Sequence, residues 1–184
     1  AEALLHREGI YDVRVEYVAG NLTDHYDPRS KVLRLSDATY QQTSVAAIGV
    51  AAHECGHAIQ HARGYAPLSI RSALVPVANF GSSIAWPLII IGLIMNSQTS
   101  QLFLNLGVIA FSMAVLFQIV TLPVELNASR RALKILGNTG MLYPDEVRET
   151  RKVLTAAALT YIAGAASAIL QLLRLIMISN SRRD

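Results

Sequence analysis

Apolar residues dominate two long stretches of the chain, and the residues outside them are largely polar. Between Arg71 and Glu125 there is no Asp, Glu, Lys or Arg, and a second uncharged stretch runs from Val153 to Leu173. A helix needs about 20 apolar residues to cross a bilayer core, so the first stretch holds two crossings and the second holds one. We predict membrane helices at Ala73–Met95, Leu102–Val124 and Leu154–Ile178.

The first two crossings are predicted to form a helical hairpin, because residues 96–101 between them are short and polar. Pro76, Pro87 and Pro123 lie within the crossings, where neighbouring helices can cover the backbone groups that a proline frees. The alternative is a soluble protein with buried core helices. It is disfavoured because roughly 100 remaining residues are too few to cover so much apolar surface.

The N-terminal polar segment shows the patterns of a small sheet followed by a helix. Apolar and polar residues alternate along Val13–Val18 and along part of Lys31–Leu35, and Asp27–Ser30 has the composition of a turn. We therefore predict a short antiparallel sheet, and then a helix from Ser44 to Ala62. The strand near Lys31–Leu35 is a candidate to bind an extended substrate by strand addition.

Composition narrows the functional classes. Charged residues make up 16% of the chain and hydrophobic residues 52%, and the net charge of +3 is too small to indicate a nucleic-acid partner. Cys55 is the only cysteine, which excludes a disulfide within the chain and a metal site built from several thiolates.

The segment His53-Glu54-Cys55-Gly56-His57 is an H-E-x-x-H motif within the predicted helix. Histidines four residues apart share one helix face and can bind one zinc ion at about 2.0–2.1 Å. Zinc lowers the pKa of a bound water towards 7, and the carboxylate of Glu54 can take its proton during attack on a peptide carbonyl. The alternative is a pair of solvated histidines, which is disfavoured because alanines and an isoleucine flank the motif and predict a buried helix.

A catalytic zinc site needs a third protein ligand, and Glu125 is the best candidate. It is the first charged residue after the long uncharged stretch, and a carboxylate at the end of a membrane helix needs a partner. The alternative is an interfacial ion pair with Arg130 or Arg131. His25 and His61 are weaker candidates, because His25 lies in a polar turn and His61 lies too far along the helix to share the site.

Three stretches of the chain carry a family resemblance: residues 22–30 (LTDHYDPRS), 51–61 (AAHECGHAIQH) and 122–133 (LPVELNASRRAL). They resemble the YugP-type family of bacterial membrane zinc metallopeptidases, and the similarity extends along essentially the whole chain. The resemblance implies one catalytic zinc ion, with His53, His57 and Glu125 as its ligands and Glu54 as the general base. Members of that family carry an additional N-terminal membrane helix, which is not among the three membrane helices predicted here.

A more distant likeness is to membrane gluzincins of the HtpX and CAAX-protease type. In their third-ligand motif an Asp follows the Glu by four residues and supports a metal-bound histidine. Ser129 stands at that position here. A serine hydroxyl is able to give part of that support, less strongly than a carboxylate.

The distribution of basic residues predicts that the polar segments face the cytoplasm of a bacterium. The polar turn at 96–101 carries no basic residue, although Arg182 and Arg183 on the same predicted side count against this orientation. Basic residues on the side of the polar segments are Arg63, Arg71, Arg130, Arg131, Lys134, Arg148, Arg151 and Lys152. We expect a multi-pass protein of the cytoplasmic membrane.

These observations predict a mainly α integral membrane protein with three transmembrane helices and a small α+β, zincin-like cytoplasmic part. The expected segments are a zincin-like part (1–72), a membrane hairpin (73–124), a third-ligand helix and loop (125–152), and a C-terminal membrane helix with its tail (153–184).

The function expected is that of a membrane-anchored zinc metalloendopeptidase with its active site at the membrane surface. It would act on a membrane-associated or unfolded polypeptide, with the bilayer and no nucleic acid as further partners. Candidates to stabilise the developing oxyanion are Arg130, Arg131, His25 and Tyr161. The alternative is a non-catalytic membrane adaptor or assembly protein that binds zinc for folding alone, and such a protein would have no use for Glu54 as a base.

Overall fold

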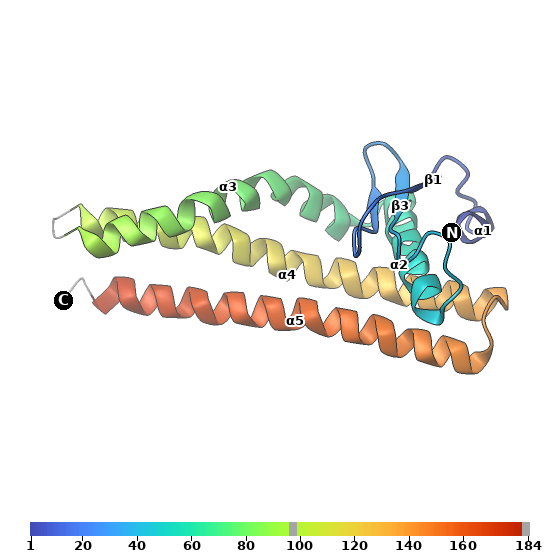
Figure 1. Ribbon diagram of the computed structural model, residues 1–184. Helices are drawn as coiled ribbons and strands as arrows, with labels where there is room; N and C mark the ends of the chain where they lie inside the picture. Colours follow the sequence, from blue (N-terminus) through green and yellow to red (C-terminus); the bar gives the residue numbers. More distant parts are fainter. Residues whose placement is uncertain (96–98, 182–184) are drawn as a thin grey trace. The chain divides into compact units, whose positions relative to one another are not determined.

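The computed structural model describes residues 1–95 and 99–181 and is mainly helical, as the apolar pattern predicts (Figure 1). Residues 96–98 of the expected polar turn, and also Arg182 and Arg183, lie outside the described residues. The elements are α1 (Glu2–Arg7), β1 (Arg14–Tyr17), β2 (His25–Asp27), β3 (Val32–Leu35), α2 (Val45–Ala62), α3 (Ala66–Ile94), α4 (Ser100–Thr139) and α5 (Pro144–Ser181).

The chain divides into two compact units. The first, here called the polar unit, comprises Ala1–Ser69 and Pro123–Leu159, and the second, the apolar unit, comprises Ile70–Leu122 and Thr160–Asp184. The three strands and α2 belong to the polar unit, whereas α3, α4 and α5 contribute residues to both units. The sequence elements that carry polar chemistry therefore come together in one unit.

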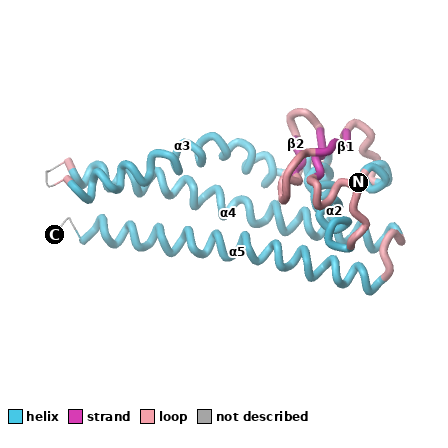
Figure 2. Tube along the Cα trace, in the orientation of Figure 1, coloured by secondary structure: helices cyan, strands magenta, loops and turns pink. Residues whose placement is uncertain are grey.

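The sheet in the polar unit is mixed, so the prediction of an antiparallel sheet was wrong. β3 lies in the centre, pairing with β1 in parallel and with β2 in antiparallel orientation. The strands are magenta in Figure 2. The turn after β2 is stabilised by the Asp27 carboxylate, which accepts hydrogen bonds from the Arg29 amide (2.9 Å) and the Ser30 hydroxyl (2.6 Å). The hairpin partner of β3 is therefore β2, which has too few residues to show an alternating pattern.

The central position of β3 also corrects the proposal that the strand near Lys31–Leu35 binds substrate by strand addition. Val32 to Leu35 pair with β1 on one side, and Val32 to Arg34 pair with β2 on the other. Strand addition requires a free row of backbone N–H and C=O groups at the edge of a sheet. Within this sheet only β1 and β2 have an edge that is not paired to another strand.

Helix α2 matches the prediction of a helix from Ser44 to Ala62. The Ser44 hydroxyl caps its N-terminus by accepting a hydrogen bond from the amide of Ala47 (3.2 Å), and Gly64 follows its end with a φ of +61°. One face of α2 joins the core of the polar unit, where Cys55 and Ile59 pack with Leu33 of β3. This packing fixes the orientation of α2, and with it the direction of His53 and His57 on another side of the helix.

In the apolar unit, the predicted membrane crossings lie in α3, α4 and α5, each of which is long and apolar enough to span a membrane. Pro76 and Pro87 lie inside α3, and Pro123 lies inside α4. Helices α3 and α4 approach closely at glycines, because a Cβ on Gly81 would lie 2.6 Å from the carbonyl oxygen of Ala110. Close packing through small residues is typical of helices in membranes.

Candidate metal centre

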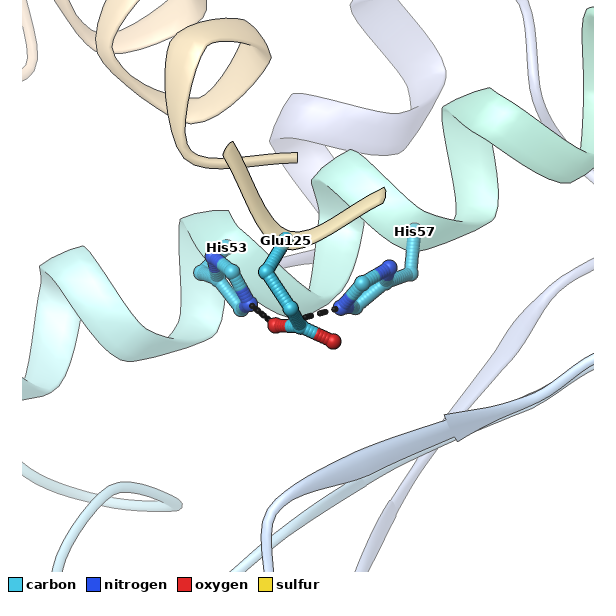
Figure 3. Close-up of side chains that lie close together, drawn as sticks. All are labelled: His53, His57 and Glu125. Carbon is cyan, nitrogen blue, oxygen red and sulfur yellow. Dashed lines mark hydrogen bonds and ion pairs between the residues drawn. The ribbon is translucent and has the colours of Figure 1, made fainter. Parts of the chain in front are cut away.

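The two histidines of the H-E-x-x-H motif lie on one face of α2, and Glu125 of α4 lies between them (Figure 3). The imidazole rings of His53 and His57 are one helical turn apart, with ring centroids separated by 4.8 Å. His57 is 8% exposed and Glu125 is 3% exposed. Three potential metal ligands therefore converge at a largely buried point in the polar unit.

The distances between the ligand atoms suit a single small cation. Glu125 Oε2 lies 3.2 Å from His53 Nε2 and 3.6 Å from His57 Nε2, and one ligand atom from each residue lies within 4.8 Å of the others. Ligands bound tetrahedrally at about 2.0–2.1 Å from zinc lie roughly 3.3–3.5 Å apart. Two imidazole nitrogens and one carboxylate oxygen are a donor set that zinc prefers in catalytic sites, so these residues fit the ion.

The electrostatics of the site favour positive charge. Burial alone would lower the pKa of His57, but the hydrogen bond to Glu125 and the neighbouring carboxylates of Glu54 and Glu125 raise this pKa above its usual value. An environment that stabilises a proton on an imidazole also stabilises a metal cation at the same place. The site is therefore prepared for a cation by its two carboxylates.

Glu54 lies in α2 directly after His53 and is 8% exposed. Together with the hydrogen bond from His57 to Glu125, which has the larger influence, the negative charge of Glu54 raises the pKa of the His57 imidazole. A carboxylate in this position is near the histidines without belonging to the group of three convergent ligands. This is the arrangement expected of a proton acceptor beside a metal site.

Both histidines have a second hydrogen-bond partner behind them. His53 Nδ1 lies 3.0 Å from the hydroxyl oxygen of Ser129, and His57 Nδ1 lies 3.0 Å from Gln60 Oε1. Ser129 thus contacts the first histidine of the H-E-x-x-H motif. Such outer partners fix the orientation of a metal-bound imidazole.

The structure also shows why α2 and α4 come so close together. A Cβ on Gly56 would lie 2.5 Å from the carbonyl oxygen of Ala128, a distance that real Cβ atoms essentially never show. Only glycine fits between the two helices at this point, and this contact lies one helical turn or less from each of the three ligands.

Gly56 and Gln60 were not singled out by the sequence analysis. A glycine inside a helix is unfavourable by about 1 kcal/mol relative to alanine, which is a signal that packing requires it. Gln60 lies three residues after His57, where side chains on a helix can meet. The sequence shows both the glycine and the spacing of Gln60 from His57. Their roles become visible only when the structure shows which residues of α4 lie opposite them.

The other candidates lie outside the cluster. His25 is exposed and contacts the carbonyl oxygen of Thr23 (2.7 Å), and His61 is exposed and contacts the Tyr26 hydroxyl (2.8 Å). Cys55 is fully buried in the core, with its sulfur 3.6 Å from the carbonyl oxygen of Ala1. None of these three side chains belongs to the group of convergent ligands among the described residues.

Of the two arginines considered as partners of Glu125, Arg131 has other contacts in the described part of the chain. Arg131 donates from Nε to Asn127 Oδ1 (2.7 Å), and its guanidinium lies 5.9 Å from the centre of the Tyr65 ring. Arg130 is exposed. Glu125 instead lies against the two histidines, as described above.

Comparison with known proteins assigns a class to this fold and site. The sequence profile of the family described as "Putative neutral zinc metallopeptidase" matches residues 1–180, and the chain belongs to this family. Over its full 184 residues it is 47% identical to the "Putative membrane protease YugP" of Bacillus subtilis (strain 168), and the match covers 80% of that relative. The family resemblance noted from the sequence is thereby confirmed. No solved structure matches the chain.

Proposed function

We propose that the protein is a membrane-anchored zinc-dependent endopeptidase. The observation that carries the proposal is the convergence of His53, His57 and Glu125 in a member of a zinc metallopeptidase family, with the buried carboxylate of Glu54 beside them. This set provides three ligands and a base, and no fourth ligand joins the group among the described residues, which is the pattern of catalytic rather than structural zinc sites.

The residues divide the chemical work in the following way. His53, His57 and Glu125 hold one zinc ion, which when bound supplies the Lewis acidity that activates water and polarises the peptide carbonyl. The carboxylate of Glu54 takes a proton from the attacking water and delivers it to the nitrogen of the departing peptide. Ser129 and Gln60 hold the two imidazole rings in place from behind.

We further propose that the active site faces the cytoplasm of a bacterium, at the surface of the cytoplasmic membrane. Glu125 follows the uncharged stretch of α4 directly, and the basic residues Arg130, Arg131 and Lys134 come within the next nine positions. Basic flanks of membrane helices are retained on the cytoplasmic side. A relative at 47% identity is described as a membrane protease.

The substrate that this position favours is a polypeptide segment that reaches the membrane surface in an extended form. A metallopeptidase needs several residues of the substrate to lie along its active site, which folded proteins do not offer. We therefore propose unfolded or membrane-associated polypeptides as the substrate class.

The test compares the wild type with Glu54→Gln in detergent, measuring zinc content and cleavage of casein, a protein without stable fold. We expect zinc in both proteins and cleavage in the wild type alone, with a loss on the order of 10²–10⁴-fold in the variant. Equal cleavage by both proteins would remove Glu54 from the mechanism. Zinc in both proteins with cleavage in neither, in detergent and in lipid vesicles alike, would favour the non-catalytic adaptor.

A further inference from the structure

Gln60 is a fully buried polar side chain that connects His57 to α4. It is 0% exposed and makes three hydrogen bonds. Its Oε1 lies 3.0 Å from His57 Nδ1, and its Nε2 donates to the main-chain carbonyl of Val124 (2.8 Å) and to Asn127 Oδ1 (3.0 Å). Both amide hydrogens and the amide oxygen are therefore used.

The orientation of this amide is fixed by its partners. The Val124 carbonyl is an acceptor only, so the atom of Gln60 that faces it must be the nitrogen. The contact with Asn127 fixes the same orientation of the Gln60 amide independently. Its Oδ1 is fixed towards Arg131, whose Nε is a donor only, and Gln60 Nε2 contacts the same oxygen. A rotated amide would place oxygen against oxygen at both contacts.

The fixed amide determines the tautomer of His57. Because Gln60 Oε1 is an acceptor, His57 Nδ1 must carry the hydrogen of this bond. A neutral imidazole has one N–H group, so the lone pair is then on Nε2, which lies 3.6 Å from Glu125 Oε2. Two acceptors facing each other in a buried site are stabilised by a positive charge between them, either a proton on the imidazole or a metal ion.

The other histidine is held differently. His53 Nδ1 contacts the hydroxyl of Ser129 at 3.0 Å, and a hydroxyl both donates and accepts. That contact is compatible with either tautomer of His53. The hydrogen bonds of the protein therefore fix the tautomer of His57 but leave that of His53 open.

We propose that Gln60 is a positioning residue of the metal centre, which holds His57 with its hydrogen on Nδ1 and its Nε2 lone pair directed at the metal. Asn127 and Arg131 hold Gln60 in turn. The inference rests on the proposed function in so far as it takes His57 as a zinc ligand. It assigns to the Arg131 side chain an anchoring contact with Asn127, in place of the oxyanion role considered from the sequence.

The first test uses the wild-type protein. In the zinc-free full chain labelled with ¹⁵N-histidine in detergent, at a pH where the imidazole is neutral, the nitrogen shifts distinguish the two tautomers. We expect His57, assigned by loss of its signals in His57→Gln, to carry its hydrogen on Nδ1. A hydrogen on Nε2 would overturn the inference, whether or not the protein cleaves casein.

The second test measures zinc affinity by competition between the protein and a chromophoric chelator. Gln60→Met keeps the length of the side chain but removes the acceptor, and we expect affinity to fall about 10–100-fold. Gln60→Glu should restore most of it, because a buried glutamic acid can accept from His57 with one oxygen and donate to Val124 with the other. Thr150→Val is the matched control, since it removes a buried hydrogen bond to the Glu146 carbonyl (2.9 Å) away from the site.

Unchanged affinity in Gln60→Met, or an equal loss in Thr150→Val, would show that Gln60 has a structural role only. If Gln60→Met does not fold, the tautomer of the wild-type protein still decides the question. Failure of the proposed function is separate, because it appears as zinc binding without cleavage while His57 keeps its Nδ1 hydrogen.

Discussion

The polar and apolar units bury their apolar side chains to very different extents. In the polar unit, α1, β3, α2, α4 and α5 all contribute to one core, with Leu5 and Leu33 fully buried. The apolar unit has a small cluster of Ile89, Leu104 and Leu175, while residues such as Phe80 remain 66% exposed. The polar unit therefore carries its own hydrophobic stabilisation. The apolar unit presents its apolar surface outward, as expected of helices surrounded by lipid.

This difference indicates that the packing of the polar unit, rather than that of the apolar unit, holds the candidate ligands in place. All three candidate ligands lie in the unit with the larger core, and a Cβ on Gly56, where their two helices meet, would make a shorter contact than a Cβ on any other described glycine. Changes in the polar unit should therefore alter metal binding. Changes in the apolar unit should alter stability in a manner that depends on detergent or lipid.

The largest expected effect is that of removing a ligand. In Glu125→Ala we expect zinc affinity to fall by more than the roughly 10–100-fold typical of losing an outer hydrogen-bond partner. Zinc content after dialysis against a weak chelator measures it. Glu149→Ala is the control, because Glu149 forms an exposed ion pair with Lys152 (2.8 Å). Zinc retention by Glu125→Ala at the wild-type level would remove Glu125 from the site.

The next effect tests the close contact of α2 with α4. A methyl group in Gly56→Ala would meet the Ala128 carbonyl oxygen at 2.5 Å, so the two helices must separate. We expect a loss of about 1–3 kcal/mol in stability together with weaker zinc binding. Gly137→Ala, where a Cβ meets nothing within 4 Å, should be neutral or stabilising by up to about 1 kcal/mol. Similar zinc affinities in the two variants would contradict the packing argument.

A third variant asks whether the two units respond separately. In Gly81→Ala the added methyl would lie 2.6 Å from the Ala110 carbonyl oxygen, within the apolar unit. We expect a lower temperature of unfolding in detergent, corresponding to about 1–3 kcal/mol, but unchanged zinc affinity. Gly164→Ala, at a position with open space, is the control. Loss of zinc in Gly81→Ala would show that the site depends on the apolar unit as well.

The smallest effect uses Cys55 as a reporter of the polar unit. Burial raises the pKa of the Cys55 thiol to about 12, so at pH 8 only about one thiol in 10⁴ is ionised. Iodoacetamide should therefore react slowly with the folded protein and rapidly after denaturation. Removing zinc with a chelator should speed the reaction, because a bound ligand stabilises the folded unit. An unchanged rate would separate zinc binding from the stability of this unit.

The sequence predicted the elements whose pattern is long or whose chemistry is specific. The three long apolar helices follow from uncharged stretches that a soluble fold of this length is too small to cover, and α2 follows from its cap at Ser44 and its motif. A carboxylate that ends such a stretch needs a partner, and this reasoning selected Glu125 before its surroundings were known.

The features that escaped prediction depend on distant parts of the chain meeting. β2 has too few residues for a pattern, and its pairing decides that the sheet is mixed. Gly56 and Gln60 acquire their meaning only when Ala128, Val124 and Asn127 lie opposite. The pattern of a single sequence predicts the helix itself and its apolar face. It does not identify the residues of distant segments that pack against that helix.

The order of the ligands along the chain has a consequence for biosynthesis. His53 and His57 leave the ribosome first, and Glu125 follows only after α3 and the uncharged part of α4 have been made. A nascent chain that ends within α3 has two ligands and no third. The complete set arises only once the uncharged part of the second long apolar helix has been translated, so a metal centre of this design stays incomplete throughout the earlier stages of synthesis.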